Sequence, residues 1–243
     1  MRRFSQTLFG LLVVTQMLYG KVPRLRTPAG TKAIVGLLLG ASGADAVASR
    51  GPARGGALVG SAAALGFAAE LAGVATGRPF GHYTYSSLLG RKVGGVPLAA
   101  AAAWSMMARP AWVVAGLISR RRAPRVALAA GALTAWDVFL DPRMAREGYW
   151  SWPGGGRYEG IPASNFLGWL ATGAGVFAVW SVIDADDDPA RDGDGALALY
   201  AWTWIGELVA NVFIWRRPRV AAAGGVAMGA FLLPALLAQR ERT

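Results

Sequence analysis

The sequence predicts an all-α integral membrane protein, a polytopic helical bundle of about eight transmembrane helices. Of its 243 residues, 54% are hydrophobic and 16% are charged, whereas soluble domains carry about 25% charged residues. The mean hydropathy is +0.36, and apolar runs close to the ~20 residues needed to cross a bilayer recur along the chain. Backbone groups in hydrocarbon must pair within their own segment, so these runs are expected to be helices.

Eight apolar spans follow one another along the chain. They cover residues 4–20, 31–48, 57–76, 96–118, 125–141, 162–183, 195–215 and 220–238. The second span is the weakest, so a bundle of seven helices is the alternative. No small-residue cleavage site follows the first span before Lys21, which favours a retained helix over a signal peptide. We find no internal repeat and expect residues 1–243 to form a single transmembrane domain.

The net charge of +11 has a simple explanation in a membrane protein. Lysines and arginines lie in short loops between the apolar spans, where they contact lipid headgroups. We therefore predict membrane lipids as partners and no nucleic acid, in a multi-pass protein of the cell membrane. With eight crossings both termini share one face, but the basic residues divide almost equally between the two faces. The arginines at 120–122 favour the terminal face as cytoplasmic only weakly.

The absence of cysteine excludes disulfides and thiolate metal sites. His82 is the single histidine of the sequence, so a histidine-rich metal site is also excluded. We predict neither a metal nor a cofactor.

The stretch from Trp136 to Trp169 is the most informative part of the sequence. The span that arrives there carries Asp137 and Asp141, which are four residues apart and therefore lie on one helical face. We expect Pro142 to end this helix. An aromatic loop follows, and the next span begins near Asn165. Carboxyl groups at such a place in a membrane helix are costly, so we interpret the stretch as the active centre.

The other acids of the spans point to the same region. Glu70 and Glu207 lie in the second halves of spans that cross in the same direction as the span of Asp137 and Asp141. These four acids are the candidate catalytic residues. The candidate substrate-binding residues, which lie in the loops of that face or in the adjoining helix ends, are His82, Tyr83, Tyr85, Trp104, Tyr149, Trp150, Trp152, Tyr158, Asn165, Trp169 and Asn211.

Each of these residues also has a structural interpretation. Glu70 can pair with Arg109 or Arg78, Asp141 can be a turn residue before proline, and the aromatic residues can form an interfacial belt. The acidic run at 184–188 falls on the opposite face, where we expect a solvated loop.

The candidate residues suit one kind of chemistry. A carboxyl group surrounded by hydrocarbon favours its neutral form and can act as a general acid near neutral pH. Aromatic faces stabilise a nearby cation. Together these groups suit protonation of an alkene, followed by capture of the resulting tertiary carbocation by water or by an internal double bond.

Four ordered motifs carry a resemblance to a known family. They read GHYTYSSLLG, GVPLAAAAAWSMM, DVFLDPRMAREGYWSW and YEGIPASNFLGW. Over about residues 65–215, the chain resembles the carotenoid biosynthesis membrane proteins that include bisanhydrobacterioruberin hydratase and related bacterial hydratases. The resemblance implies cofactor-independent addition of water to the terminal double bond of an acyclic carotenoid, which yields a tertiary alcohol.

The roles of individual residues are hypotheses from position and chemistry. Asp137 would protonate the alkene, and Asp141 or Glu207 would hold and deprotonate the attacking water, although acid and base can be exchanged. Asn165 would orient the water or a carboxyl group. The aromatic residues that would line the end of the polyene and shield the cation are Tyr83, Tyr85, Trp150 and Trp152.

Three other functions remain open at the level of sequence. A membrane carotenoid cyclase would use the same acid but capture the cation internally. A magnesium-dependent prenyltransferase would use the DxxxD spacing of Asp137 and Asp141, but the second acidic cluster, at 184–188, falls on the opposite face. A lipid carrier or transporter would use the buried acids for protons, although the repeats common in transporters are missing. Small-residue faces also permit a homo-oligomer.

Overall fold

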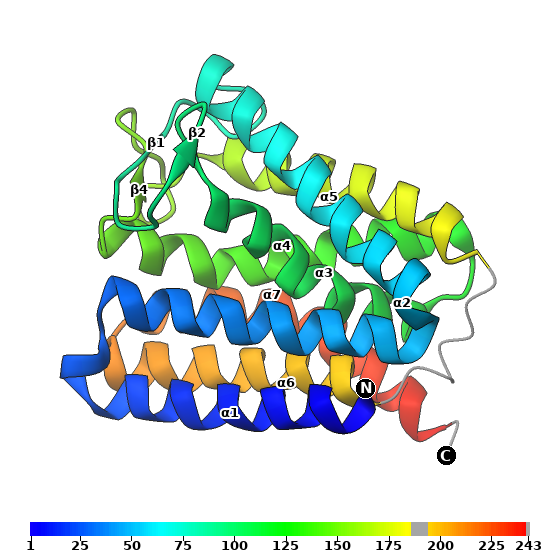
Figure 1. Ribbon diagram of the computed structural model, residues 1–243. Helices are drawn as coiled ribbons and strands as arrows, with labels where there is room; N and C mark the ends of the chain where they lie inside the picture. The colour runs from blue at the N-terminus through cyan, green and yellow to red at the C-terminus, as the bar shows by residue number, and fades with distance from the viewer. Residues whose placement is uncertain (186–193, 242–243) are drawn as a thin grey trace.

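The computed structural model describes residues 1–185 and 194–241, and helices dominate it (Figure 1). The long helices are α1 (Arg2–Lys21), α2 (Pro28–Thr76), α3 (Leu98–Ile118), α4 (Arg122–Arg146), α5 (Ala163–Ile183), α6 (Asp194–Val209) and α7 (Pro218–Arg240). A short 3₁₀-helix, η1 (Pro23–Leu25), follows α1, and a π-helical turn, η3 (Ala210–Ile214), extends α6. The strands β1 (Thr84–Tyr85), β2 (Lys92–Val93), β3 (Val96–Pro97) and β4 (Trp150–Ser151) have two residues each.

Helix α2 is a hairpin rather than a straight rod. Gly51 has φ 79° and ψ 165°, which is not helical and is accessible essentially to glycine alone. The arms 28–50 and 52–76 fold back on each other there (Figure 1). The arms also touch closely at Gly55, where an added Cβ would lie 2.7 Å from the Val47 backbone.

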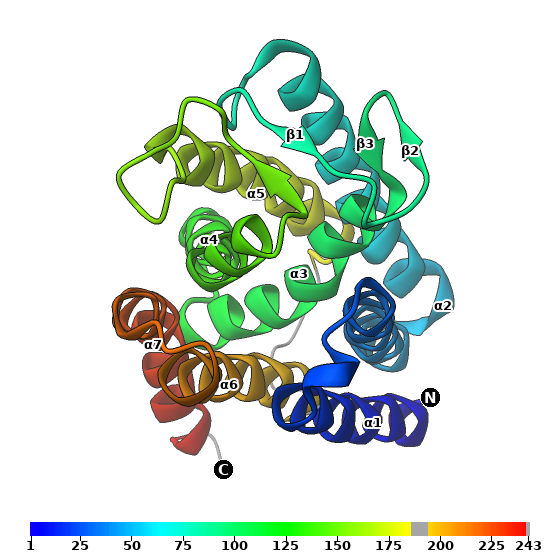
Figure 2. The same ribbon diagram turned by 90° about the vertical axis from the view of Figure 1, so that its left-hand side faces the viewer.

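The two arms of α2 bring the described chain to eight helical rods, which match the eight predicted spans. Six helices, with α2 counted once, are long and apolar enough to cross a membrane by length and composition. The predicted all-α membrane bundle is therefore confirmed. Helix α3 lies in the middle of the bundle (Figure 2), and every residue from Trp104 to Leu117 is buried.

One predicted helix boundary is wrong. Helix α4 continues through Pro142 to Arg146. Proline has no N–H to donate to the carbonyl four residues earlier, which here belongs to Val138. The Tyr158 hydroxyl donates to that carbonyl at 2.9 Å. A side chain from the following loop thus replaces the missing helical hydrogen bond and ties the loop to α4.

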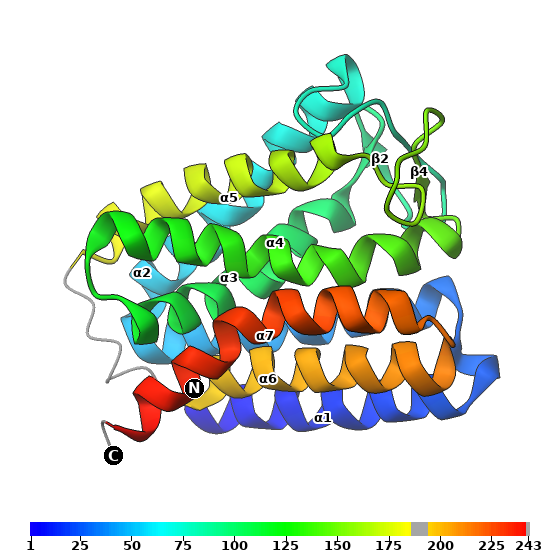
Figure 3. The same ribbon diagram turned by 180° about the vertical axis from the view of Figure 1, so that it is seen from behind.

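The two long loops pair with each other at one end of the bundle. Strand β1 pairs antiparallel with β4, with Thr84 opposite Ser151 and Tyr85 opposite Trp150. Strands β2 and β3 form a second antiparallel pair. Figure 2 faces this end, and Figures 1 and 3 show both chain termini at the opposite end. The termini thus share one end of the bundle, as an even number of helical rods requires.

Buried ion pairs hold the terminal end together. Arg109 Nε lies 3.1 Å from Asp45 Oδ2, and Arg50 Nε lies 2.7 Å from Asp184 Oδ1. The Trp112 indole donates to the other Asp184 oxygen at 3.0 Å. Asp184 was expected in a solvated loop, but it is 2% exposed, and this expectation is corrected. The other acids of that run, at 186–188, lie outside the described residues.

Candidate active site

Asn165 joins the two aspartates of α4. Its Nδ2 atom lies 3.0 Å from Asp137 Oδ2 and also donates to Asp141 Oδ2. All three side chains are buried, with exposed fractions of 0% for Asp137 and 2% for Asp141 and Asn165. The helical spacing places both carboxyl groups on one face of α4, and Asn165 reaches them from the first turn of α5. We call Asp137 and Asp141 the carboxyl pair, and the side chain of Asn165 its amide.

The two carboxyl groups differ in their remaining contacts. Trp150 Nε1 donates to Asp141 Oδ1 at 3.0 Å, so both Asp141 oxygens accept a hydrogen bond. Asp137 Oδ1 is buried and has no hydrogen-bond partner within residues 1–185 and 194–241. Asp141 lines a cavity between the helices, and Asp137 is not among the residues that line it. Asp141 is therefore the member of the pair that a substrate can touch.

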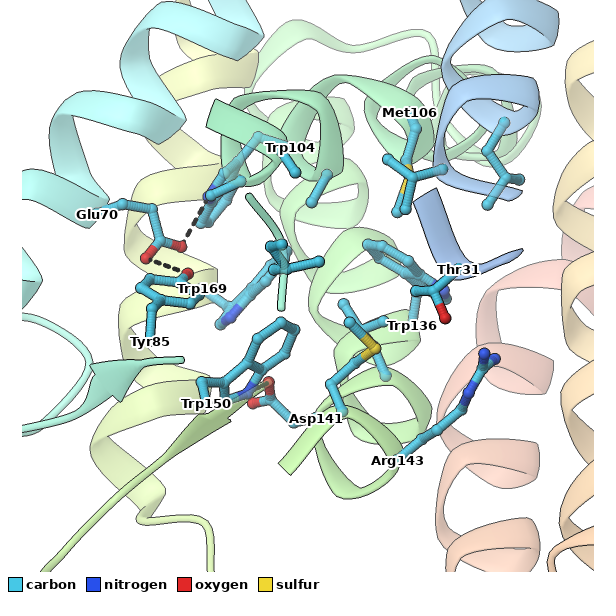
Figure 4. A pocket seen from close by; sticks show the side chains of 18 of the residues that line it. Thr31, Glu70, Tyr85, Trp104, Met106, Trp136, Asp141, Arg143, Trp150 and Trp169 are labelled. Carbon is cyan, nitrogen blue, oxygen red and sulfur yellow. Dashed lines mark hydrogen bonds between the residues drawn. The ribbon is translucent and has the colours of Figure 1, made fainter. Parts of the chain in front are cut away.

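Glu70 lies on another wall of the cavity and is held by three aromatic donors. The hydroxyls of Tyr83 and Tyr85 both donate to Glu70 Oε2, the latter at 2.8 Å, and Trp104 Nε1 donates to Oε1 at 3.1 Å. Figure 4 shows Glu70 between Tyr85 and Trp104. Burial raises the pKa of both tyrosine hydroxyls, with the Glu70 charge adding to the effect, so both stay protonated as donors.

The contacts of Glu70 do not include the arginine pairing that the sequence allowed. Its partners in the structure are the three aromatic side chains, and Arg109 is paired with Asp45 instead. Glu70 orders an aromatic wall.

The aromatic side chains around the acids pack against one another. Trp104 stacks on Trp169 at 4.1 Å, and Trp136 meets Trp169 edge to face at 6.1 Å. Tyr85 meets Trp150 edge to face at 5.7 Å. Gly66 of α2 makes room for this wall, since a Cβ there would lie 2.1 Å from the Trp104 ring. Indole faces therefore surround the position that Asp141 can reach (Figure 4).

Most of the predicted site residues line this one cavity. The predicted residues that line it are Glu70, Tyr83, Tyr85, Trp104, Asp141, Trp150, Trp152, Asn165, Trp169 and Glu207. The remaining predicted residues, Asp137, His82, Tyr149, Tyr158 and Asn211, are not among its lining residues.

The predicted residues outside the cavity have other contacts. Tyr149 donates its hydroxyl to Thr31 Oγ1 at 2.9 Å, and Tyr158 donates to the Val138 carbonyl. Asn211 Nδ2 lies 3.3 Å from Glu207 Oε2. The His82 ring packs beside Gly77, where an added Cβ would come within 2.7 Å of it.

Arg143 is a cavity residue that the sequence did not suggest. It faces Glu207, with 3.7 Å between Nη1 and Oε1, and its Nε lies 3.2 Å from Glu147. Its guanidinium also lies 5.2 Å from the ring centre of Tyr19 and 5.5 Å from that of Trp215. Because the sequence placed a helix end at Pro142, Arg143 fell outside the predicted span. An unbroken α4 would have placed it beside the acids.

Within the described ranges, 1–185 and 194–241, no group of three or more histidine, aspartate or glutamate side chains is arranged to hold a metal ion. The described acids of the cavity are instead bound by amide, indole, phenol and guanidinium donors.

The fold and the cavity define a class: an integral membrane bundle with buried acids in an apolar, aromatic cavity. The chain belongs to the carotenoid biosynthesis protein family, whose model matches residues 31–232. It is 30% identical over 110 residues to bisanhydrobacterioruberin hydratase of Haloarcula japonica. That alignment covers 43% of this chain and 37% of the relative, so the chain matches well under half of the relative's length. No solved structure matches the chain. Membership in the family assigns the protein a role in carotenoid biosynthesis.

Proposed function

We propose that this protein is a carotenoid hydratase that adds water to the terminal double bond of an acyclic carotenoid. The observation that carries the proposal is the carboxyl pair and its amide, which meets an apolar cavity walled by indole rings. Similarity to a hydratase over part of the chain supports the same reaction. The proposal also places the protein in the cell membrane among lipids, with a homo-oligomer permitted.

The carboxyl pair supplies the acid. Two carboxyl groups that share one amide nitrogen repel each other when both are ionised, so the pair retains a proton. Asp141 lines the cavity and delivers this proton to the less substituted carbon of the alkene. The sequence-based hypothesis gave this step to Asp137. We now assign Asp137 the position behind Asp141, where its Oδ1 atom has a free hydrogen-bonding site.

Protonation leaves a tertiary carbocation on the neighbouring carbon. Trp150 and Trp169 line the cavity, and indole rings stabilise nearby positive charge by their quadrupoles. The ionised carboxyl pair adds a compensating negative charge close by. Glu70 keeps the wall in place through Tyr83, Tyr85 and Trp104, so it is a positioning residue.

Water completes the reaction. Its oxygen forms a bond with the tertiary carbon, and one of its protons returns to the ionised carboxyl pair. One C–H bond and one C–O bond form, the C=C π bond breaks, and the pair regains its proton. Glu207 lines the same cavity and is the second carboxyl group that can accept the proton. The proposed reaction, written in this way, requires no cofactor.

Pigment analysis tests the proposal. A host that makes acyclic carotenoids is compared with and without this chain by chromatography and mass spectrometry, with the Asp141→Asn variant as control. Hydration predicts pigments heavier by one or two waters, formed also in membranes treated with EDTA, and absent with the variant. An unchanged mass with a shifted absorption spectrum indicates a cyclase. Dependence on magnesium indicates prenyl transfer, and bound but unaltered pigment indicates a carrier.

A further inference from the structure

A second chamber adjoins the candidate active site. It lies between α1 and the end of α6, which run side by side (Figure 2). The two spaces share the lining residues Gln16, Ile34, Arg143, Thr203 and Glu207. The two spaces are therefore neighbours, and these shared side chains stand between the candidate active site and the seam between α1 and α6.

Two contacts tie α1 to the α6 side, one toward each end of this chamber. Trp202 Nε1 donates to Gln16 Oε1 at 2.6 Å. One helical turn further along α1, Gly20 packs so closely on Ile214 that an added Cβ would lie 2.8 Å from it. Between these contacts, Gly206 faces open space, because an added Cβ there would meet no atom within 4 Å.

The mouth of the chamber reaches the outer surface of the bundle. Met17 on α1, and Ile205 and Val209 on α6, line the chamber and are each 48% exposed. The seam is thus an opening on the outer surface of the bundle, bounded by apolar side chains from both helices.

The polar groups at the junction are already paired with protein. Gln16 accepts from Trp202, Glu207 faces Arg143 and Asn211, and the Arg143 guanidinium lies near the rings of Tyr19 and Trp215. A ligand passing the junction therefore meets polar groups that are already paired. Beyond the junction the chamber is lined by Met17, Ile205, Val209 and Ile214, which suit a hydrocarbon chain.

We propose that this chamber holds the polyene body of the acyclic carotenoid whose terminal double bond lies at Asp141, and that the substrate enters from the bilayer between α1 and α6. The identity of the ligand rests on the proposed function. A carotenoid is a long, stiff rod. When one end lies against the carboxyl pair, the rest must leave the site, and a shift of the shared side chains would open a path into the adjoining chamber.

The proposal is tested by attaching a bulky group inside the chamber after the protein has folded. The chain contains no cysteine, so a Gly206→Cys variant can be alkylated selectively with N-phenylmaleimide in the folded protein. The matched control is Gly175→Cys, since Gly175 of α5 is exposed and also has open space at its Cβ position. Binding of lycopene, which is achiral and gains circular dichroism bands in a chiral site, is titrated in detergent. Alkylation should weaken binding about tenfold or more at position 206 and leave binding unchanged at position 175. Bound lycopene should also slow alkylation at position 206.

The experiment distinguishes an error in the chamber proposal from an error in the hydratase proposal. Equal lycopene binding by the two alkylated variants, or no induced dichroism with the unmodified protein, overturns the chamber proposal whatever the activity. Binding that depends on position 206, in a protein that adds no water, keeps the chamber and rejects the hydratase.

Discussion

At the scale of the residue, the proposed chemistry depends on one amide nitrogen held against two carboxyl groups. Helical spacing was enough to place Asp137 and Asp141 on one face, and the first-turn position of Asn165 was enough to bring it near them. The order in which the two acids meet the cavity was not predictable, because it depends on the rotation of α4 within the bundle. The groups that donate hydrogen bonds to Glu70 could not be predicted from the sequence either, because they come from a loop and from α3.

Replacing Asp141 with asparagine should reduce turnover by about 10²- to 10⁴-fold, the usual contribution of a general acid. Asparagine has nearly the same shape but cannot donate the carboxyl proton. Asp137→Asn should reduce turnover less, because the group that faces the alkene is retained. Product formation in isolated membranes measures both effects, with size-exclusion profiles as the folding control. Near-normal turnover by Asp141→Asn would contradict the assignment.

Glu70 should matter for stability through its three donors. Glu70→Ala leaves the buried Tyr83 and Trp104 and the partly buried Tyr85 without this acceptor, and each buried unsatisfied group costs about 1–3 kcal/mol. Glu70→Gln keeps one oxygen as an acceptor and should be less destabilising. Thermal unfolding of the purified variants measures the difference. Equal melting temperatures for wild type and Glu70→Ala would show that the aromatic wall does not depend on this carboxyl group.

At the scale of the element, local backbone features decide what the helices can present. The hairpin at Gly51 divides α2 into two spans, and Pro52 begins the second arm. Hydropathy predicted both arms, but no local signal distinguished a close hairpin from a longer connection. At Pro142, propensity predicted a helix end, but the Tyr158 hydroxyl satisfies the freed carbonyl. A contact distant in sequence therefore overrides the local preference, and Arg143 enters the cavity as a result.

Glycine positions on the second arm of α2 should respond differently to alanine. At Gly66 the added Cβ would lie 2.1 Å from the Trp104 ring, whereas at Gly60 it would meet nothing within 4 Å. Gly66→Ala should cost about 1–3 kcal/mol of stability through overpacking and should reduce turnover by displacing the wall. Gly60→Ala should be neutral or stabilising by up to about 1 kcal/mol. Thermal unfolding and product yield measure the two variants together, and matching behaviour would contradict the packing described here.

At the scale of the whole molecule, the bundle separates its two ends. Paired loops and the candidate site occupy one end, and the buried ion pairs Arg109–Asp45 and Arg50–Asp184 lie toward the end that carries both termini. Hydropathy predicted the helices and their even number. It did not predict the burial of Asp184, because the partners of that residue come from α2 and α3. Charge balance left the orientation in the membrane undetermined.

Labelling of single cysteines should map the two ends. Ala123 lies in the first turn of α4 and Gly154 lies in the loop after this helix, and both are exposed. Ala123→Cys and Gly154→Cys should react with a membrane-impermeant maleimide from opposite sides of the membrane, without background from the cysteine-free chain. Reporter fusions at the two termini should report the same side as position 123. Labelling of positions 123 and 154 from one side would reject the arrangement of the helices across the membrane.

The most direct test of the central claim is the source of the oxygen in the product. Membranes containing the protein are incubated with an acyclic carotenoid in H₂¹⁸O, and the pigments are analysed by mass spectrometry. Hydration predicts a tertiary alcohol that carries ¹⁸O and is lost with Asp141→Asn. A product of unchanged mass, or one whose oxygen does not come from water, would contradict the hydratase account.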